Sequence, residues 1–166
     1  MTVLTPKEST VPDPVSLDET DRRLLNVLQE SNALTNDALA RKVHVSPATC
    51  LRRVKRLVDA GVIERQIAVV SPDALAGGMT AILEVTLDRQ SAEALAAFET
   101  HVAADHAVQQ CYRVSGGPDF VLVVFANDMD AYHAFVQRAL TAAANVRNVR
   151  AFFSVRRAKF APRIPL

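Results

Sequence analysis

The stretch Ser46–Gly61, SPATCLRRVKRLVDAG, predicts a helix with one apolar and one basic side. Ser46 is a good N-cap because its hydroxyl can accept a hydrogen bond from an unpaired backbone N–H, and Pro47 suits the first helical position. Gly61 is expected to close the helix, since glycine adopts the left-handed conformation without a Cβ clash. At about 100° per residue, one side holds the apolar residues Cys50, Leu51, Val54, Leu57 and Val58.

The opposite side of this helix is predicted to be polar and basic. Thr49, Arg52 and Arg56 point away from the apolar side, and Arg53 and Lys55 lie on its flanks. Such a helix docks through one side and presents cations on the other. Taken alone, the pattern fits an ordinary amphipathic surface helix as well as a helix that enters a DNA groove. The neighbouring elements decide between the two interpretations.

Two further short helices are predicted before Ser46. Asp18 is placed to cap the first, which carries the apolar stripe Leu24, Leu25 and Leu28, and Thr35 is placed to cap the second. None of the three helices is long enough to be stable alone, so they need a common core. We expect this core to contain Leu24, Leu28, Leu39, Val43, Leu51, Val54 and Leu57. Three short helices with a brief turn between the second and third are typical of a helix-turn-helix.

From Met79 onward the pattern changes to strands that alternate with helices. Strands are predicted over 79–87, 107–114, 120–126 and 146–155, and helices over 91–104 and from Asp128. The two strand–helix–strand halves superimpose at an offset of roughly 38 residues, which places Val85 on Val123, Val108 on Val146 and Cys111 on Val149. Two such units predict a ferredoxin-like βαββαβ sheet with both helices on one face.

The second face of that sheet is predicted to be bare. It would hold Phe152 or Phe153, and an apolar face of this size calls for a partner, of which a second copy of the chain is the simplest. The β-prone runs Val62–Ile63 and Ile67–Val70 fit either a wing or the link between the domains. The predicted fold class is therefore α+β: an N-terminal (winged) helix-turn-helix domain followed by a ferredoxin-like domain. The expected boundaries are 1–16 for a disordered arm, 17–63 for the helix-turn-helix domain, 64–78 for a β linker, 79–160 for the ferredoxin-like domain and 161–166 for a tail.

Charge is unevenly distributed although the net charge is only +1. Residues 17–61 carry a balance of +2, residues 71–144 a balance of −6, and residues 145–166 six basic residues and no acidic one. A local basic face is enough to neutralise phosphates, so the total does not exclude nucleic acid. Cys50 and Cys111 lie in apolar segments and indicate a reducing compartment. No apolar run approaches the ~20 residues of a membrane span, and no signal region is visible, so a cytoplasmic protein without a membrane partner is expected.

The chain resembles the Lrp/AsnC family, the leucine- and asparagine-responsive feast/famine transcription regulators. The resemblance covers about Leu17 to Phe160 and rests on LDETDRRLLNVLQ, on SPATCLRRVKRLVDAGVI and on VSGGPDF. It implies a transcriptional regulator that binds a pseudo-palindromic site in double-stranded DNA. It also implies a ligand-binding domain of the RAM/Lrp type that senses a small molecule, usually an amino acid. Homodimers that assemble into tetramers or octamers are a further implication.

The same resemblance assigns candidate site residues. Those predicted to bind DNA are Ser46, Pro47, Thr49, Arg52, Arg53 and Arg56, to which the helix pattern adds Lys55 as a phosphate contact. Those predicted to bind the effector are Gly116, Asp119, Phe152, Phe153 and Ser154, to which Gly117 is added from the same loop. For Arg52 and Arg56 the alternative to DNA contact is an ordinary charged helix face that is exposed to solvent. For Asp119 the alternatives are an acceptor for the effector's α-ammonium group and an ordinary turn aspartate. Gly117 and Pro118 stand where many members carry an acid and an aromatic residue.

No pattern indicates catalysis, a metal ion or a cofactor. His101, His106 and His133 lack metal-ligand spacing, and there is no phosphate-binding glycine loop. Two rival functions remain: a tetrapyrrole decarboxylase on the same two-domain scaffold, against which the basic side of the Ser46–Gly61 helix argues, and a co-regulator that acts through hetero-oligomers. The basic residues after position 155 fit either a charged edge that discourages strand pairing or extra phosphate contacts; they are Arg156, Arg157, Lys159 and Arg163.

Overall fold

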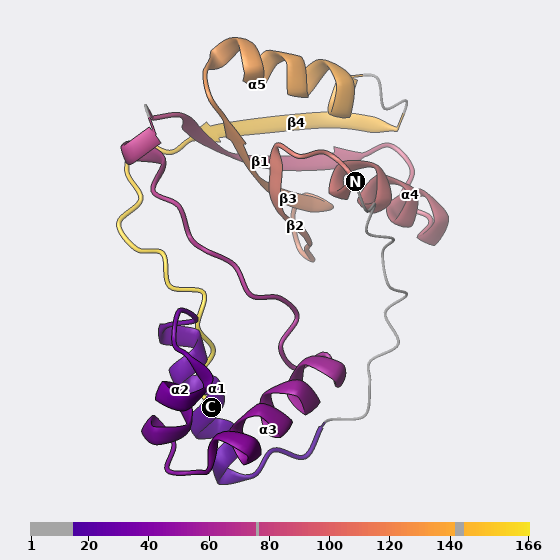
Figure 1. Ribbon diagram of the computed structural model, residues 1–166. Coiled ribbons are helices and arrows are strands. Elements are labelled where there is room, and N and C mark those ends of the chain that lie inside the picture. The colour runs from indigo at the N-terminus through magenta and orange to yellow at the C-terminus, as the bar shows by residue number, and fades with distance from the viewer. Residues whose placement is uncertain (1–14, 76, 142–144) are drawn as a thin grey trace. The chain divides into compact units, whose positions relative to one another are not determined.

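The protein, seen here in a computed structural model, consists of two compact units (Figure 1). The structure describes residues 15–75, 77–141 and 145–166, so most of the predicted N-terminal arm lies outside the described residues. The helical unit comprises residues 15–70 together with Lys159–Leu166. The sheet unit comprises Ser71–Ala158. The chain therefore passes from the helical unit to the sheet unit and back again.

The helical unit contains the three predicted helices with the predicted caps. They are α1 (Glu19–Glu30), α2 (Asn36–Lys42) and α3 (Pro47–Asp59). Each N-cap side chain accepts a hydrogen bond from the backbone N–H three residues later: Asp18 from Asp21 at 2.9 Å, Thr35 from Ala38 at 3.2 Å and Ser46 from Thr49 at 3.2 Å. After α3, Gly61 takes a φ of +70°, as predicted for a helix end.

The core of the helical unit differs from the prediction in α3. Its buried residues are Leu24, Leu39, Ala40, Val43 and Cys50, with Leu28 and Val54 half-buried against them. Leu57 is fully buried too, but Leu51 is 61% exposed and Val58 is 46% exposed. The prediction that Leu51 belongs to the core is therefore wrong. The apolar side of α3 is centred on Cys50 and Leu57, which leaves Leu51 and Val58 at its outer edge.

The segment after α3 forms no strand between Val62 and Val70, although both of its β-prone runs were expected to be extended structure. A strand needs a neighbour to accept and donate its backbone hydrogen bonds, and the described part of this chain offers this segment none. A short 3₁₀ turn, η1 (Pro72–Leu75), follows.

The sheet unit has the predicted ferredoxin-like topology. Its elements in order are β1 (Met79–Leu87), α4 (Ala92–Ala103), β2 (Val108–Arg113), β3 (Phe120–Ala126), α5 (Met129–Phe135) and β4 (Val146–Phe153). A π-helical turn over Val136–Thr141 continues α5. The strands pair antiparallel in the order β2-β3-β1-β4. The two most apolar strands, β1 and β3, therefore lie in the centre of the sheet. No helix in the described parts of the chain is long and apolar enough to cross a membrane.

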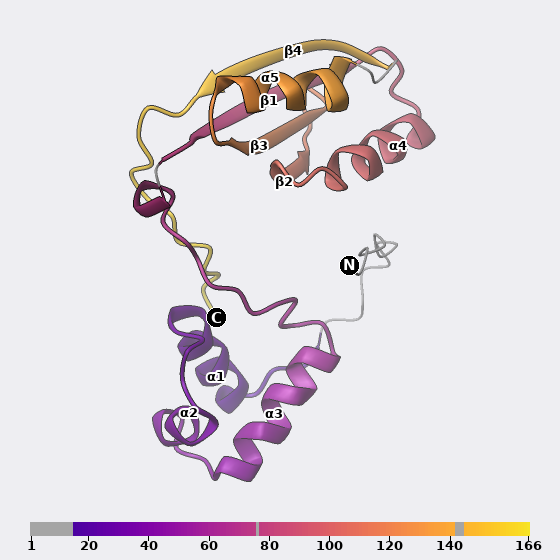
Figure 2. The same ribbon diagram turned by 45° about the horizontal axis from the view of Figure 1, so that its top comes forward.

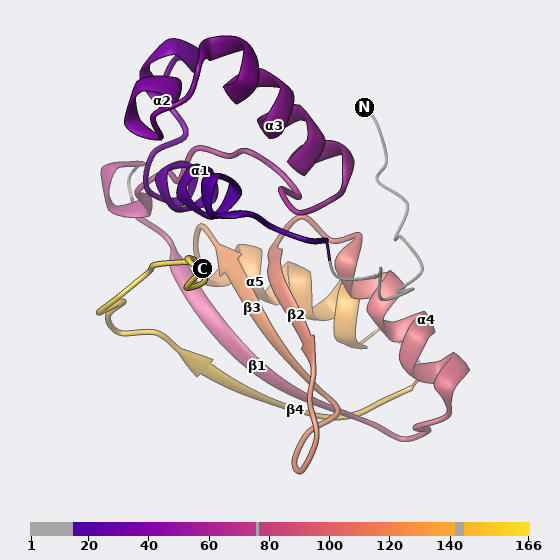
Figure 3. The ribbon, with the colours of Figure 1, turned by 90° about the horizontal axis from the view of Figure 1, so that it is seen from below.

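One face of the sheet is covered by both helices (Figures 2 and 3). Alternate residues of β1 and β3 bury against them, namely Ala81, Leu83, Val85 and Leu87 with Phe120, Leu122, Val124 and Ala126. Val108, Cys111, Val146 and Val149 pack on this face as well, so the predicted repeat aligns β2 with β4 correctly. It places Val85 on Val123 wrongly, because Val123 pairs with Ile82 on the other face. An offset by one residue reverses the face of every side chain in a strand.

The other face carries a row of apolar side chains across the sheet. Val123 pairs with Ile82, and Ile82 pairs with Phe152. Ile82 is 41% exposed and Phe152 is 45% exposed. Phe153 instead belongs to the helix side, where its ring meets the edge of Tyr132 at a centroid distance of 5.0 Å. Of the two candidates, Phe152 therefore lies on the bare face.

Candidate functional site

The N-terminal end of α3 is held in place by hydrogen bonds from its own cap and from α2. The Ser46 hydroxyl donates to the Thr49 hydroxyl at 2.9 Å and accepts from the Thr49 backbone. The Asn36 side chain donates to the Pro47 carbonyl at 2.9 Å and so ties the start of α2 to the start of α3. Ser46 and Pro47 are exposed and Thr49 is half-buried. This end of the helix is therefore rigid, capped and open to a ligand.

The exposed side of α3 presents Arg52 and Lys55. Arg52 has no ion pair or side-chain hydrogen bond within the described residues. Lys55 makes only an exposed ion pair with Asp59, one helical turn away, at 3.2 Å. Pairs of this kind contribute roughly 0.3–0.5 kcal/mol and exchange readily for a stronger anion. Two cations on this side are thus available to phosphate groups or base edges.

Arg53 and Arg56 are turned toward α1 instead. The Arg53 Nη1 atom lies 2.6 Å from Asp18 Oδ2 and 2.9 Å from Asp21 Oδ1, and only 21% of its side chain is exposed. Arg56 donates through Nη2 to the second Asp21 oxygen and keeps 45% of its side chain exposed. These ion pairs join residues that are 32 to 35 positions apart in the sequence. They fasten α3 to the start of α1.

Asp21 is the centre of this ion-pair cluster and is only 1% exposed. Burial alone would raise its pKa, but hydrogen bonds from Arg56, Arg53 and the Asp18 backbone N–H outweigh burial and lower the pKa to about 2. Asp21 lies in the first turn of α1, where the helix dipole favours an acid, and its place in this cluster was not predicted from the sequence. The sequence does contain a signal for this cluster. Asp18 and Asp21 are three residues apart at the start of one helix, and Arg53 and Arg56 are three residues apart on another, so each pair spans about one helical turn.

The burial of Arg53 also explains the error about Leu51. Cys50, Arg53 and Leu57 lie at i, i+3 and i+7 and so share one side of α3. The alkyl stem of Arg53 covers part of the interface while its guanidinium pairs with Asp18 and Asp21. The inward side of α3 is therefore rotated away from Leu51 and Val58 and toward Arg53.

In the sheet unit, Asp119 ties two elements together. Its Oδ2 atom accepts hydrogen bonds from the Leu87 backbone N–H at 2.7 Å and from the Gln90 side chain at 3.2 Å. Its backbone N–H donates to the Val85 carbonyl at 2.9 Å. Gly116 takes a φ of +81°, and both Gly116 and Gly117 are exposed with open space around them. Both side-chain hydrogen bonds of Asp119 thus end on its Oδ2 atom. No hydrogen bond within the described residues uses the Oδ1 atom.

The remaining predicted effector residues lie at the other end of β1. Phe152 and Phe153 pair with Ile82 and Ala81, and the Ser154 N–H donates to the Thr80 carbonyl at 2.8 Å. Asp119 contacts Val85 and Leu87, three to seven residues further along β1, which at ~3.3 Å per residue is roughly 10–23 Å away. Within one chain, the predicted effector residues therefore form two separate groups and not one pocket.

A cavity of about 450 Å³ lies in the helical unit and contains none of the predicted effector residues. It is lined by α1, by the segment after α3 and by the last residues of the chain. Among the described residues, no group of three or more His, Cys, Asp and Glu side chains is arranged to hold a metal ion.

Two protein families match the two units. Residues 17–64 match the winged helix-turn-helix DNA-binding domain, and residues 80–164 match the Lrp/AsnC ligand binding domain. Together the matches span nearly all of the described chain. The basic, capped α3 and the four-stranded sheet thus each fall within the domain that the resemblance implied.

Relatives that align with most of this chain agree with this. The chain is 40% identical over 138 residues to an HTH-type transcriptional regulator from Haemophilus influenzae, covering 83% of this chain and 82% of that one. It is 36% identical to the leucine-responsive regulatory protein of Rhizobium meliloti, covering 92% and 97%. The solved structure of a Neisseria meningitidis transcriptional regulator in complex with L-methionine aligns with a TM-score of 0.80 at 34% identity, covering 90% and 97%. The chain belongs to the Lrp/AsnC family of helix-turn-helix transcriptional regulators with a ligand-binding domain.

Proposed function

We propose that this regulator reads DNA through the exposed side of α3 and that an amino acid bound to the sheet unit changes its affinity or assembly. The observation that supports DNA reading most directly is the pair of available cations, Arg52 and Lys55, on a helix whose capped N-terminus is exposed. In this proposal Ser46, Pro47 and Thr49 approach the backbone or base edges and Arg52 reads a base. Lys55 meets phosphate.

Arg53 and Arg56 receive different roles in the proposal. Arg53 positions α3 because both of its carboxylate partners lie on α1 and its side chain is mostly buried. Arg56 is proposed to pair with Asp21 and to reach a phosphate with the exposed part of its guanidinium. The DNA-facing charge of each subunit is then carried by Arg52, Lys55 and part of Arg56.

Binding to the DNA upstream of the protein's own gene is the first test. We expect a shifted complex at low salt that withstands a large excess of unrelated DNA. The affinity should fall steeply as salt rises, since each neutralised phosphate releases counterions. Absence of any complex at low salt would contradict the proposal.

Arg52→Gln and Lys55→Gln are expected to weaken DNA binding in different ways. Loss of a bidentate arginine–base contact should cost about 1–3 kcal/mol per subunit and relax the preference at one base pair of each half-site. Loss of a lysine–phosphate contact should leave sequence preference unchanged. It should reduce the slope of log K against log salt by about 0.9 per subunit. Fluorescence anisotropy across a salt series, with single-base variants of the site, separates the two roles.

The effector is proposed to be an amino acid. A relative of the same family, the Neisseria regulator, was solved with L-methionine. Asp119 offers a carboxylate beside two exposed glycines, whose backbone N–H groups suit a ligand carboxylate. Because the Gly116–Asp119 loop and Phe152–Ser154 lie at opposite ends of β1, we propose that one effector site combines the loop of one subunit with the β4 end of another.

Asp119→Ala is expected to abolish the amino-acid response and leave DNA binding intact. Asp119→Asn is the informative companion, because its amide oxygen can still accept from the Leu87 N–H but carries no charge for an α-ammonium group. A thermal-shift screen of the twenty amino acids gives the readout, since a ligand at 100 times its Kd adds about 2.7 kcal/mol. An unchanged response in Asp119→Ala would exclude this residue from the site.

We further propose how the subunits assemble, where in the cell the protein lies and that it is not an enzyme. Closure of the bare sheet face by a second copy gives a homodimer, which places two α3 helices on the halves of a pseudo-palindromic site. Tetramers or octamers follow if dimers join through the effector sites. A cytoplasmic location follows from the DNA partner. The rival decarboxylase is not favoured, and purified protein that takes up a haem-like ligand stoichiometrically would revive it.

A further inference from the structure

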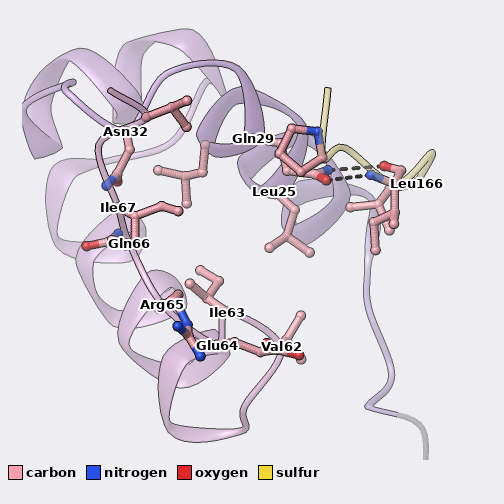
Figure 4. A pocket seen from close by; sticks show the side chains of 14 residues that line it. Leu25, Gln29, Asn32, Val62, Ile63, Glu64, Arg65, Gln66, Ile67 and Leu166 are labelled. Carbon is pink, nitrogen blue, oxygen red and sulfur yellow. Dashed lines mark hydrogen bonds between the residues drawn. The ribbon is translucent and has the colours of Figure 1, made fainter. Parts of the chain in front are cut away.

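The last eight residues of the chain belong to the helical unit and not to the sheet unit that precedes them. They hold α1 through Gln29 and Glu30. The Gln29 side chain donates to the Ile164 carbonyl at 3.2 Å and accepts from the Ile164 N–H at 2.8 Å. Arg163 forms an ion pair with Glu30 at 2.6 Å. One amide side chain thus satisfies both backbone groups of a single residue, as a neighbouring strand would (Figure 4).

The sequence of this segment, KFAPRIPL, favours the bound conformation before it docks. Pro162 and Pro165 have fixed φ angles, and each restricts the residue before it to extended backbone. Ile164 is therefore extended because it precedes Pro165. The free segment has few conformations to lose, so a small number of polar contacts suffices to hold it. This matters because Ile164 stays 66% exposed and its side chain contributes little burial.

Both chain connections to the sheet unit end at the same place on α1. The 450 Å³ cavity is lined on one side by Leu25 and Leu28 of α1. The outgoing connection contributes Ile63 and Ile67 to its walls, and the returning segment contributes Ile164 and Leu166 (Figure 4). Only Val155–Ala158 separate the end of the β4 pairing at Ser154 from the docked segment. Four residues span at most about 14 Å, so the segment is closely tethered to β4.

We propose that Lys159–Leu166 is a strap that docks on the Gln29–Glu30 surface of α1 in its own chain. It forms a second connection between the helical and sheet units. The strap also accounts for Arg163, one of the basic residues after position 155, as a docking residue for Glu30. The strap gives the end of β4 a second covalent route to α1, in addition to the segment that follows α3. This goes beyond the proposed function and does not depend on DNA or effector binding.

Cross-linking of the intact protein tests the strap. In a Cys111→Ser background, which leaves the fully buried Cys50 in place, a short bismaleimide should join Glu30→Cys to Arg163→Cys. We expect a product with monomer mobility on a denaturing gel. The control pair is Arg22→Cys with Arg163→Cys, because Arg22 is an exposed α1 residue two turns away, or about 12 Å along the helix. A product with dimer mobility would assign the strap to a partner subunit, and a yield no higher than the control would remove the docking surface altogether.

A tryptophan reporter tests the role of Gln29. The chain contains no tryptophan, so Leu166→Trp gives a single emission signal from the cavity wall. Its emission should be blue-shifted relative to the free peptide KFAPRIPW. Adding Gln29→Ala and Glu30→Ala should move it to the peptide value, whereas adding Arg22→Ala should not. Emission that ignores Gln29 and Glu30 would overturn the proposed docking contacts.

Discussion

Asp21→Asn is expected to unfold most of the helical unit at 25 °C and to abolish DNA binding with it. The substitution leaves Arg56 without its carboxylate partner and Arg53 with only Asp18, whose side chain is 53% exposed. Removing one partner of a buried ion pair costs about 3–5 kcal/mol, and the lower end applies here because Arg56 is 45% exposed and can turn to water. Three short helices have little stability to lose. Amide hydrogen exchange in α1–α3 reports the free energy of unfolding of this unit separately from the sheet unit.

Asp59→Asn is the matched control for this prediction. Asp59 makes the same kind of contact with Lys55, but both side chains are mostly exposed, so its loss should change the free energy of unfolding by less than about 0.5 kcal/mol. Equal effects of the two substitutions would show that the Asp21 cluster does not hold the helical unit together.

The same cluster predicts how acid acts on the helical unit. The pKa of Asp21 is lowered from 3.8 to about 2 in the folded protein, so its carboxylate stabilises the fold above pH 4 and this contribution disappears as the pH falls toward 2. The shift corresponds to roughly 2 kcal/mol. A pH series of α1–α3 exchange should show this loss in the unaltered chain. Asp59→Asn, which leaves the Asp21 cluster intact, should show the same loss.

Local rules and long-range contacts explain why some predictions were right and others were not. The caps at Asp18, Thr35 and Ser46 depend on residues three positions apart, so the sequence alone indicates them. The inward turn of Arg53 depends on carboxylates 32 and 35 positions away, which no periodicity of α3 contains. The sheet face of Phe152 depends on its pairing register with Ile82, and adjacent phenylalanines leave that register open. The two groups of effector residues were assigned from the family resemblance and not from contacts that the sequence of one chain predicts.

Ile82→Glu is expected to dissociate the proposed homodimer and leave the monomer folded. Ile82 lies in the middle of the apolar row on the bare sheet face, between Val123 and Phe152, and is 41% exposed in the single chain. A carboxylate is therefore hydrated in the monomer but loses its water when a second copy covers this face. Such a charge costs several kcal/mol in each subunit, which corresponds to a loss of at least about 10²-fold in dimer affinity. Analytical ultracentrifugation measures the change, and circular dichroism verifies that the fold persists.

DNA affinity should fall when the dimer dissociates. The second α3 then no longer binds at a high effective concentration, and this lowers the affinity about 10²–10⁴-fold. Thr100→Glu adds the same charge at an exposed position of α4, on the opposite side of the sheet unit, and should change neither assembly nor DNA affinity. A dimer that survives Ile82→Glu but dissociates with Thr100→Glu would place the interface on the helices. The row of Val123, Ile82 and Phe152 would then need another partner, because an exposed apolar row across three strands is costly in a free monomer.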